Sequence, residues 1–321
     1  MNHILEMLCS GDYVSGEEMS RKLNMTRAAV WKRIEALREE GWDIESGGKK
    51  GYHLDAGDRI DPVLWENGLQ TYELGRQTNR YAYSLDSTNR QVKQMAIEGC
   101  AHGSLALCEE QTAGRGRLGR NWVSGPGVGL WHSLLLRPRL KPSEAPLVTF
   151  ACACAMAEAL EKLGVKGVCI KWPNDLILQG KKICGILNEV SCDMDQIEYL
   201  VLGVGLNVRK GAVPEALAEK AGCIEDFYDP PLRRTILSAY LLEMERIMKR
   251  IEETGFDGLE QEYRVRSCTL GRKVQVIGTQ TFEGTARDMD AAGALLVEDN
   301  KGVLHRVLAG DVSVRGVMGY V

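Results

Sequence analysis

The sequence lacks a strong excess of charge of either sign, a basic and apolar segment at its start, and a long uninterrupted apolar run. Its 40 Lys and Arg stand against 44 Asp and Glu, so a nucleic acid or an anionic membrane would need a local basic patch. Glu6 interrupts the first apolar stretch, and no basic residue precedes it, which is unlike a secretion signal. The most apolar segment, residues 145–160, is shorter than the roughly 20 residues of a membrane span. We therefore expect a cytoplasmic protein with no membrane partner.

The sequence also lacks any Cys-x-x-Cys pair among its ten cysteines. Cys152 and Cys154 lie in a run of small residues typical of a buried helix, on which residues two apart do not face each other. The pattern favours reduced thiols that fill a core over a metal site or a disulfide. With 321 residues, 44% of them hydrophobic and 26% charged, the chain is long enough for two or three globular domains.

Residues 1–60 carry the order of a winged helix-turn-helix. A short apolar helix comes first, a capping box at Ser15–Glu18 opens a second helix, and Thr26 can cap a third. Residues 42–54 then form an expected hairpin with its tip at residues 47–51.

Positive charge in this segment gathers on the third helix and on the hairpin tip, although the segment as a whole is slightly acidic. A recognition helix and a wing meet DNA phosphates with these parts. The residues that we expect to contact DNA are Arg27, Ala28, Lys32, Arg33, Lys49 and Lys50. A small helical domain that serves dimer contacts is the alternative interpretation.

A loop at residues 111–122 alternates glycine with arginine between two apolar, strand-like runs. Glycine lets the backbone approach a ligand, and fixed guanidinium groups surround an anion, so the loop favours a phosphate-bearing ligand. The spacing Gly114-x-Gly116-x-x-Gly119 also matches a dinucleotide fingerprint. However, a strand-like run follows instead of a helix, and Arg137–Arg139 stands where an acidic residue is needed about 20 positions on. We therefore set aside a nicotinamide or flavin site.

Two polar motifs, Asp86–Asn89 and Lys171–Asp175, close further strand-like runs. After a turn at Gln179–Gly180 come the run Gly180–Leu187 and a glycine-broken strand that contains Gly203–Asn207. Together with the arginine loop, and in this order, they resemble the biotin protein ligase family. With the winged segment in front, the whole chain resembles the bifunctional ligase and repressor branch of that family.

The resemblance implies an α+β multidomain fold. Its parts are an N-terminal winged helix-turn-helix over residues 1–60, a central mixed-sheet ligase domain like that of class II synthetases over residues 62–265, and a C-terminal SH3-like β-barrel over residues 268–321. Short strand patterns separated by turn sequences at residues 290–293 and 299–302 agree with a small barrel.

The resemblance also implies a reaction in two halves. Biotin and MgATP give biotinyl-5'-adenylate and pyrophosphate, and a lysine of the biotin carboxyl carrier domain of acetyl-CoA carboxylase, or of a related biotin enzyme, then displaces AMP. Biotin would be substrate and corepressor, ATP and Mg²⁺ the other ligands, and a homodimer bound to biotinyl-adenylate would occupy operator DNA.

The same resemblance assigns site residues. Lys182, Arg117 and Asp175 would be catalytic. Biotin would meet Ser87, Thr88, Asn89, Gln111, Arg115, Gly116, Arg117, Lys182, Gly203 and Gly205. ATP and the adenylate would meet Arg117, Arg120, Trp122, Lys171, Asn174, Lys182, Asn207 and Arg315. One carboxylate is too little for a dedicated metal site, so Mg²⁺ is expected to arrive with ATP, and Asp175 either contacts it or orients the carrier amine.

Two other functions stay open. One is a ligase whose winged segment no longer binds DNA, and the other is a regulator that binds biotin without catalysis, or a related ligase for lipoate. The glycine content of the loop, together with the family resemblance, further implies that the adenylate orders a mobile loop and thereby changes DNA affinity through a dimer surface.

Overall fold

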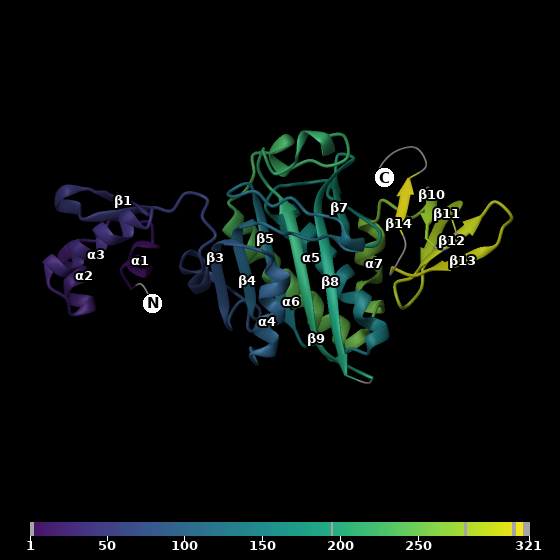
Figure 1. Cartoon of the computed structure of the whole chain (residues 1–321), viewed down its shortest axis with the longest axis horizontal. Helices are drawn as coiled ribbons and strands as arrows, with labels where there is room; N and C mark the ends of the chain where they lie inside the picture. Colours follow the sequence, from purple (N-terminus) through teal and green to yellow (C-terminus); the bar gives the residue numbers. More distant parts are fainter. Residues whose placement is uncertain (1–2, 194, 279–280, 310–312, 317–321) are drawn as a thin grey trace. The chain divides into compact units, whose positions relative to one another are not determined.

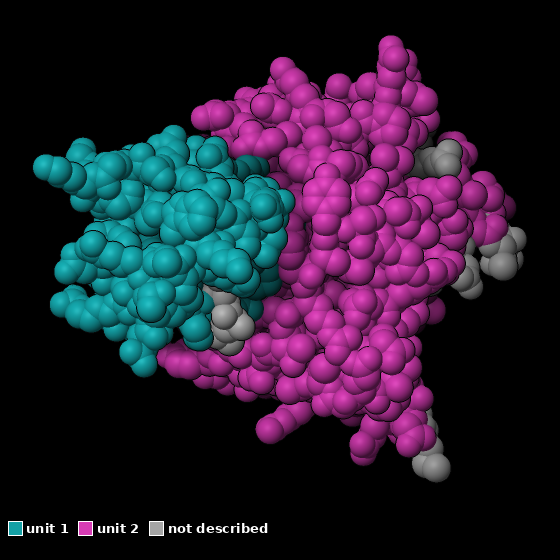
Figure 2. Space-filling model, turned by 60° about the vertical axis from the view of Figure 1, so that its left-hand side comes forward, with its two compact units in different colours: residues 1–68 teal, residues 69–321 magenta. Residues whose placement is uncertain are grey.

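The computed structural model describes residues 3–193, 195–278, 281–309 and 313–316. It divides into two compact units, residues 1–68 and residues 69–321, which Figure 2 shows in different colours.

The first unit is three helices followed by a two-stranded hairpin. They are α1 (His3–Leu8), α2 (Gly16–Leu23), α3 (Arg27–Glu39), β1 (Asp43–Ser46) and β2 (Tyr52–Asp55). The two predicted helix caps are confirmed, since Ser15 Oγ accepts the amide of Glu18 and Thr26 Oγ1 accepts that of Ala29. Such caps satisfy amides that the first helical turn leaves unpaired.

The core of this unit forms between α3 and its neighbours. Val30, Ile34 and Leu37 are fully buried on one face of α3, at the spacing that an amphipathic helix requires. Val63 and Leu64, in a 3₁₀ turn that follows the hairpin, pack against the same core, so the unit extends through Gly68.

The second unit is built on a seven-stranded mixed sheet, with strand order β3-β4-β5-β9-β8-β7-β6 (Figure 1). Only the β3–β4 pair is parallel among these described strands. The strands are β3 (Asn79–Leu85), β4 (Leu105–Gln111), β5 (Gly129–Leu136), β6 (Cys169–Lys171), β7 (Asp175–Leu178), β8 (Lys181–Asp193) and β9 (Gln196–Asn207). The helices are α4 (Thr88–Ile97), α5 (Ala145–Lys162), α6 (Arg233–Thr254) and α7 (Asp257–Arg266). The mixed sheet and the α+β organisation are confirmed.

The two faces of the sheet carry different elements (Figure 1). Helix α4 covers one face, where its Val92 and Met95 are buried against Leu135 of β5. Helices α5 and α6 cover the other face, where Tyr240 of α6 packs on His132 of β5 with ring centroids 5.2 Å apart. Because side chains alternate along a strand, Ser133 faces the same side of β5 as Leu135, the side that α4 covers.

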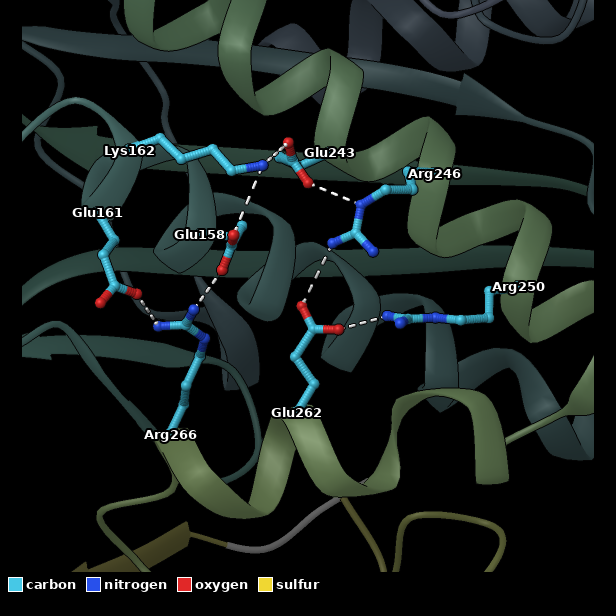
Figure 3. A network of polar contacts seen from close by, with 8 residues as sticks. All are labelled: Glu158, Glu161, Lys162, Glu243, Arg246, Arg250, Glu262 and Arg266. Carbon is cyan, nitrogen blue, oxygen red and sulfur yellow. Dashed lines mark hydrogen bonds and ion pairs between the residues drawn. The ribbon is translucent and has the colours of Figure 1, made fainter.

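Helices α5, α6 and α7 are joined by a network of four acidic and four basic side chains (Figure 3). Glu243, whose side chain is 5% exposed, pairs with Lys162 at 2.6 Å and with Arg246 at 2.8 Å. Arg266 continues the network by pairing with Glu158 and Glu161 of α5. These pairs hold α7, which leads into the last part of the chain.

Helix α5 is the core helix of this unit. With its preceding turn it spans Pro142–Lys162, which is longer than the sequence segment suggested. By length and composition alone it could cross a membrane. However, most of this helix is buried inside the protein, and Cys152 and Cys154 are fully buried.

The C-terminal part is an antiparallel sheet with strand order β13-β12-β11-β10-β14. Its strands are β10 (Lys273–Ile277), β11 (Phe282–Met289), β12 (Leu295–Asp299), β13 (Leu304–Val307) and β14 (Ser313–Gly316). The arrangement is consistent with an SH3-like domain, although no pairing between β13 and β14 closes a barrel within the described residues. Trp172 anchors it, because the indole donates 3.1 Å to the carbonyl of Gly293.

Candidate active site

A chain of buried and partly buried hydroxyl and amide groups lies where α4 begins. Gln111, at the end of β4, accepts hydrogen bonds from Thr88 through its backbone amide (2.9 Å) and its hydroxyl (3.2 Å). The Gln111 amide donates 2.8 Å to Ser124 Oγ. Ser133 Oγ lies 2.7 Å from Thr88 Oγ1 and 2.6 Å from Asn89 Oδ1. We call Thr88, Asn89, Gln111, Ser124 and Ser133 the polar floor.

Asn89 extends the polar floor toward β8 and β9. Its Nδ2 donates 2.7 Å to Glu189, whose other oxygen pairs with Lys93 at 2.6 Å. A methyl group on Gly203 would collide with the Asn89 amide, so this glycine makes room for Asn89 in the present structure.

Ser87 is the N-cap residue of α4, yet its side chain makes no capping hydrogen bond. It is buried, with 3% of its surface exposed. Its backbone amide instead donates 2.6 Å to Asp86, whose pKa is lowered chiefly by the hydrogen bond from Arg90. The hydroxyl of Ser87 is therefore not committed to the helix end.

The arginine loop is a closed hairpin whose backbone bonds join Gln111 to Ser124, Gly114 to Trp122, and Gly116 to Arg120. These bonds join the two arms of the loop across their whole length. Its side chains divide into two groups, since Arg115 and Arg120 are exposed while Arg117 is partly buried.

Arg117 connects the loop to two other segments. Its guanidinium donates 2.9 Å to Asn174 Oδ1 and also donates to the carbonyl of Ala309, just before β14. Asn174 is itself fixed, because its Nδ2 donates 2.9 Å to the carbonyl of Ile186 on β8. Lys171, in the same turn region, is 6% exposed.

Lys182 lies in an ion pair and against an aromatic ring. Its Nζ is 2.6 Å from Asp175 Oδ1 and 5.2 Å from the centre of the Trp122 ring. The Trp122 indole rests on the sheet where Gly185 and Gly205 are neighbours on β8 and β9, and a Cβ on either glycine would come within 2.8 Å of it. The absent side chains therefore admit Trp122 to the surface of the sheet.

Asn207 has a position that supports Lys182. It is buried, and its Nδ2 donates 3.0 Å to the carbonyl of Gly222. The segment around Gly222 exchanges backbone hydrogen bonds with Lys182, so Asn207 holds the segment that fixes the backbone of this lysine.

Arg315 lies in β14 opposite Gln275, but its side chain falls outside the described residues. No group of three or more His, Cys, Asp or Glu that could hold a metal ion occurs among the residues that the structure describes. Asp175 is the carboxylate that pairs with Lys182.

The structure places the predicted DNA-contacting residues on the surface of the first unit. Ala28, Lys32 and Arg33 are exposed on α3, and Arg27 is exposed but pairs with Glu17 at 2.6 Å. Lys49 and Lys50 lie at the hairpin tip, in the short 3₁₀ turn Gly48–Lys50.

The sequence did not point to several polar-floor partners. Ser124, Ser133, Glu189 and Lys93 come from four separate segments, and the fold alone brings them together. One signal was present, because Ser133 places a hydroxyl in the middle of a strand that is otherwise apolar except for His132.

Comparison with known proteins agrees with this arrangement. Residues 81–207 match the biotin/lipoate A/B protein ligase family, residues 1–53 an HTH domain, and residues 269–315 the biotin protein ligase C-terminal domain. The chain is 31% identical to the bifunctional ligase/repressor BirA of Escherichia coli over 315 residues, covering 97% of this chain and 96% of that protein. It is 30% identical to the BirA of Bacillus subtilis over 308 residues, covering 94% of each.

A solved structure of the biotin protein ligase from Aquifex aeolicus in complex with biotin and ATP is 27% identical, with a TM-score of 0.66, and covers 74% of this chain and 99% of that one. Three observations agree on one family: the motifs, the mixed sheet with its polar floor, and the long alignments that include the HTH domain. The chain belongs to the biotin protein ligase family, in its bifunctional ligase/repressor branch.

Proposed function

We propose that this protein joins biotin to ATP to give biotinyl-5'-adenylate and pyrophosphate, transfers the biotinyl group to a lysine of a carrier domain, and represses biotin genes as a DNA-binding protein. The observation that carries the ligase assignment is the placement of Lys182, Trp122 and Arg117 beside a buried polar floor. The extent of the similarity to bifunctional relatives supports both activities.

The polar floor is suited to the ureido ring of biotin. A urea offers two N–H donors and a carbonyl acceptor, and Thr88, Asn89 and Gln111 offer complementary hydroxyl and amide groups held by buried hydrogen bonds. We assign Ser87 to the same ring because its hydroxyl is not used as a helix cap. Analogues without the urea would leave these groups unpaired and bind poorly.

The first chemical step joins the biotin carboxylate to the α-phosphate of ATP. A carboxylate oxygen attacks phosphorus, and pyrophosphate leaves with the electron pair of the broken P–O bond. Lys182 would release Asp175 and place its charge between the two anions, where negative charge builds up. Arg117, from the arginine loop, would neutralise charge on the leaving pyrophosphate and on the adenylate and so retain the intermediate.

The remaining assigned residues surround the nucleotide and the biotin tail. Arg120 would meet phosphate, and Trp122, beside Lys182, would pack near the adenine. Backbone of the loop and of β9 would lie along the biotin chain. These supporting residues are Arg115, Gly116, Lys171, Asn174, Gly203, Gly205, Asn207 and Arg315.

Mg²⁺ would be held mainly by ATP phosphates. The described residues provide no metal cage, but Asp175 fits one position of an oxygen-rich shell. After adenylate formation, Asp175 would be available to orient the lysine amine of the carrier domain. That amine attacks the acyl carbon, and AMP leaves with the electrons of the acyl–phosphate bond.

Intact mass spectrometry tests the ligase assignment directly. We expect a carrier domain of acetyl-CoA carboxylase to gain one biotinyl group when it is incubated with this protein, biotin and MgATP, and not when its acceptor lysine is replaced. Biotin-dependent exchange of pyrophosphate into ATP isolates the first half-reaction. Absence of both signals would favour a non-catalytic biotin sensor, while activity with lipoate alone would indicate the related acyl ligase.

The repressor activity would use residues 1–60, with residues 62–265 as the ligase domain and residues 268–321 as its C-terminal domain. Mobility-shift titrations on the organism's own biotin-gene promoters, at rising salt, test DNA binding. Failure to bind with ligase activity intact would show that the winged segment no longer recognises DNA.

A homodimer formed with biotinyl-adenylate would place two winged segments on an operator. Strand β8 offers a surface for it, because its pairing with β7 ends at Gly185 while the strand continues to Asp193, and no other strand pairs with that edge among the described residues. A free strand edge can pair with a second copy. Sedimentation with and without biotin and MgATP tests this, and the expected cellular location is the cytoplasm, where carrier proteins and DNA are found.

A further inference from the structure

Trp31 is unusual among the six tryptophans of the chain because 57% of its surface is exposed. The others are buried or partly buried: Trp42, Trp65, Trp122, Trp131 and Trp172. A large exposed aromatic side chain gains much from being covered, and tryptophan is enriched at the energetic centres of interfaces.

Trp31 lies in the first half of α3, next to the buried face of this helix. Thr26 caps the helix, and Val30 and Ile34 are buried, so the Trp31 ring extends along the flank of α3. Helix α3 is the second helix of the helix-turn-helix, the recognition helix. Trp31 therefore lies in the N-terminal part of the helix that contacts base edges in such proteins.

The acidic side chains near the Trp31 ring, Glu17 and Glu35, are each paired with an arginine. Arg27, one helical turn before Trp31, pairs with Glu17 at 2.6 Å. Arg38 pairs with Glu35 at 2.6 Å and also donates to the carbonyl of Ile44 on β1. These pairs reduce the repulsion that Glu17 and Glu35 would exert on an anionic partner near Trp31.

The adjacent cations favour DNA as the partner. Lys32 and Arg33 are exposed directly after Trp31, and Lys49 and Lys50 lie at the hairpin tip of the same unit. Phosphates account for the cations but not for an apolar ring between them. In the major groove, the apolar group on a base edge is the 5-methyl group of thymine.

We propose that Trp31 reads DNA sequence, with its ring against a thymine 5-methyl group in the major groove. Lys32 and Arg33 then supply affinity for any duplex, and Trp31 supplies preference for one sequence. This inference rests on the proposed operator binding and names the base group that the protein recognises.

Selection from a random duplex DNA pool provides the probe. Wild-type protein with biotin and MgATP would select a preferred duplex, whose affinity is then measured at several salt concentrations for Trp31→Ala, Trp31→Phe and Lys32→Ala. Tyr72→Ala is the matched control, because Tyr72 is 91% exposed and lies in the second unit. Thermal unfolding of each variant verifies its fold.

We expect Trp31→Ala to weaken binding of the selected duplex by roughly tenfold or more, the scale of one lost base contact, with random duplex binding unchanged. Lys32→Ala should weaken both duplexes and reduce the slope of log affinity against log salt by about 0.9, whereas Trp31→Ala should keep the slope. Trp31→Phe should bind with intermediate affinity, and Tyr72→Ala should bind as the wild type does.

Replacing single thymines of the selected duplex by uracil removes the 5-methyl group alone. Wild type should lose affinity at one or two positions, and Trp31→Ala should be insensitive to the same replacements. Equal sensitivity of both proteins, normal binding by Trp31→Ala, or an equal loss on selected and random DNA would each overturn the inference. If wild type enriches no sequence and binds no duplex, the proposed repressor activity fails as well, which distinguishes the two failures.

Discussion

The polar floor and the cationic side chains around it differ in how firmly they are held. We call Arg115, Arg120 and Lys182 the cationic rim. Floor residues are buried and bonded to one another, as for Thr88, Asn89 and Ser133, which are 3%, 7% and 0% exposed. On the rim, Arg115 and Arg120 are exposed, and Lys182 is held by an ion pair that a ligand can replace. A rigid floor suits recognition of a neutral ring, and a rim of replaceable partners suits charge that appears during reaction.

Lys182→Ala should have the largest effect, because it removes a catalytic charge of the rim and leaves the biotin-binding floor intact. We expect biotin-dependent pyrophosphate exchange to fall by at least about 10²–10³-fold, because one charge that stabilises the developing anion is removed. Biotin affinity, measured by calorimetry, should be largely kept, since the floor is intact. Lys181→Ala, which changes the neighbouring lysine, is the control, and near-normal exchange in Lys182→Ala would show that its role is misassigned.

Ser133→Ala should have the opposite pattern. The hydroxyl that lies between Thr88 and Asn89 is lost, so biotin affinity should fall by roughly 10- to 100-fold, the scale of an unsatisfied buried polar group. Turnover at saturating biotin should change less. Ser191→Ala, near the far end of β8, is the control, and unchanged calorimetric affinity in Ser133→Ala would show that the floor does not bind biotin.

His132 allows the comparison to be extended to the opposite face of β5. Burial lowers the pKa of His132 to about 3, so the folded state keeps it neutral while the unfolded state takes up a proton below about pH 6.5. The unfolded state therefore binds more protons in this range, and stability is lost as pH falls from about 6.5 toward 3.

When the pH is lowered from 7 to 5, protonation of His132 in the unfolded state should reduce the free energy of unfolding by about 2 kcal/mol. The folding equilibrium constant should fall by roughly 30-fold. Denaturant titrations at both pH values measure the loss. His132→Leu should reduce the difference, and an unchanged difference in that variant would assign the acid sensitivity to other groups.

Arg117→Gly should give the smallest effect. One guanidinium that bonds Asn174 and the Ala309 carbonyl is removed, and we expect biotinyl-adenylate to dissociate roughly tenfold faster, the scale of one charged hydrogen bond. Leu118→Gly also adds a glycine to the loop but keeps the charge, so it controls for loop flexibility. If both variants released the adenylate equally fast, flexibility and not charge would retain it.

Local features of the fold could be predicted well from the sequence. The caps at Ser15 and Thr26, the hairpin tip and the turn at Gln179–Gly180 depend on neighbouring residues alone, and the structure has them where the sequence indicates. Helices α6 and α7 were not anticipated, because their burial depends on α5 and on the sheet.

Site residues within a motif could be named from the sequence, but their partners could not. Nothing near Arg117 indicates that it bonds the Ala309 carbonyl 192 residues away. Similarly, Gly203 and Gly205 signal a close approach, but the sequence does not say that Asn89 and Trp122 are what approaches them. Such contacts arise only when distant strands pair.

The position of Trp122 makes its intrinsic fluorescence sensitive to occupancy of the site. Its indole lies against the sheet with an ammonium group near its face, so its emission depends on both neighbours. A molecule that draws Lys182 away or stacks on the ring alters the colour and intensity of that emission. Occupancy of the site can therefore be followed in unlabelled protein, by the difference between wild-type and Trp122→Phe spectra.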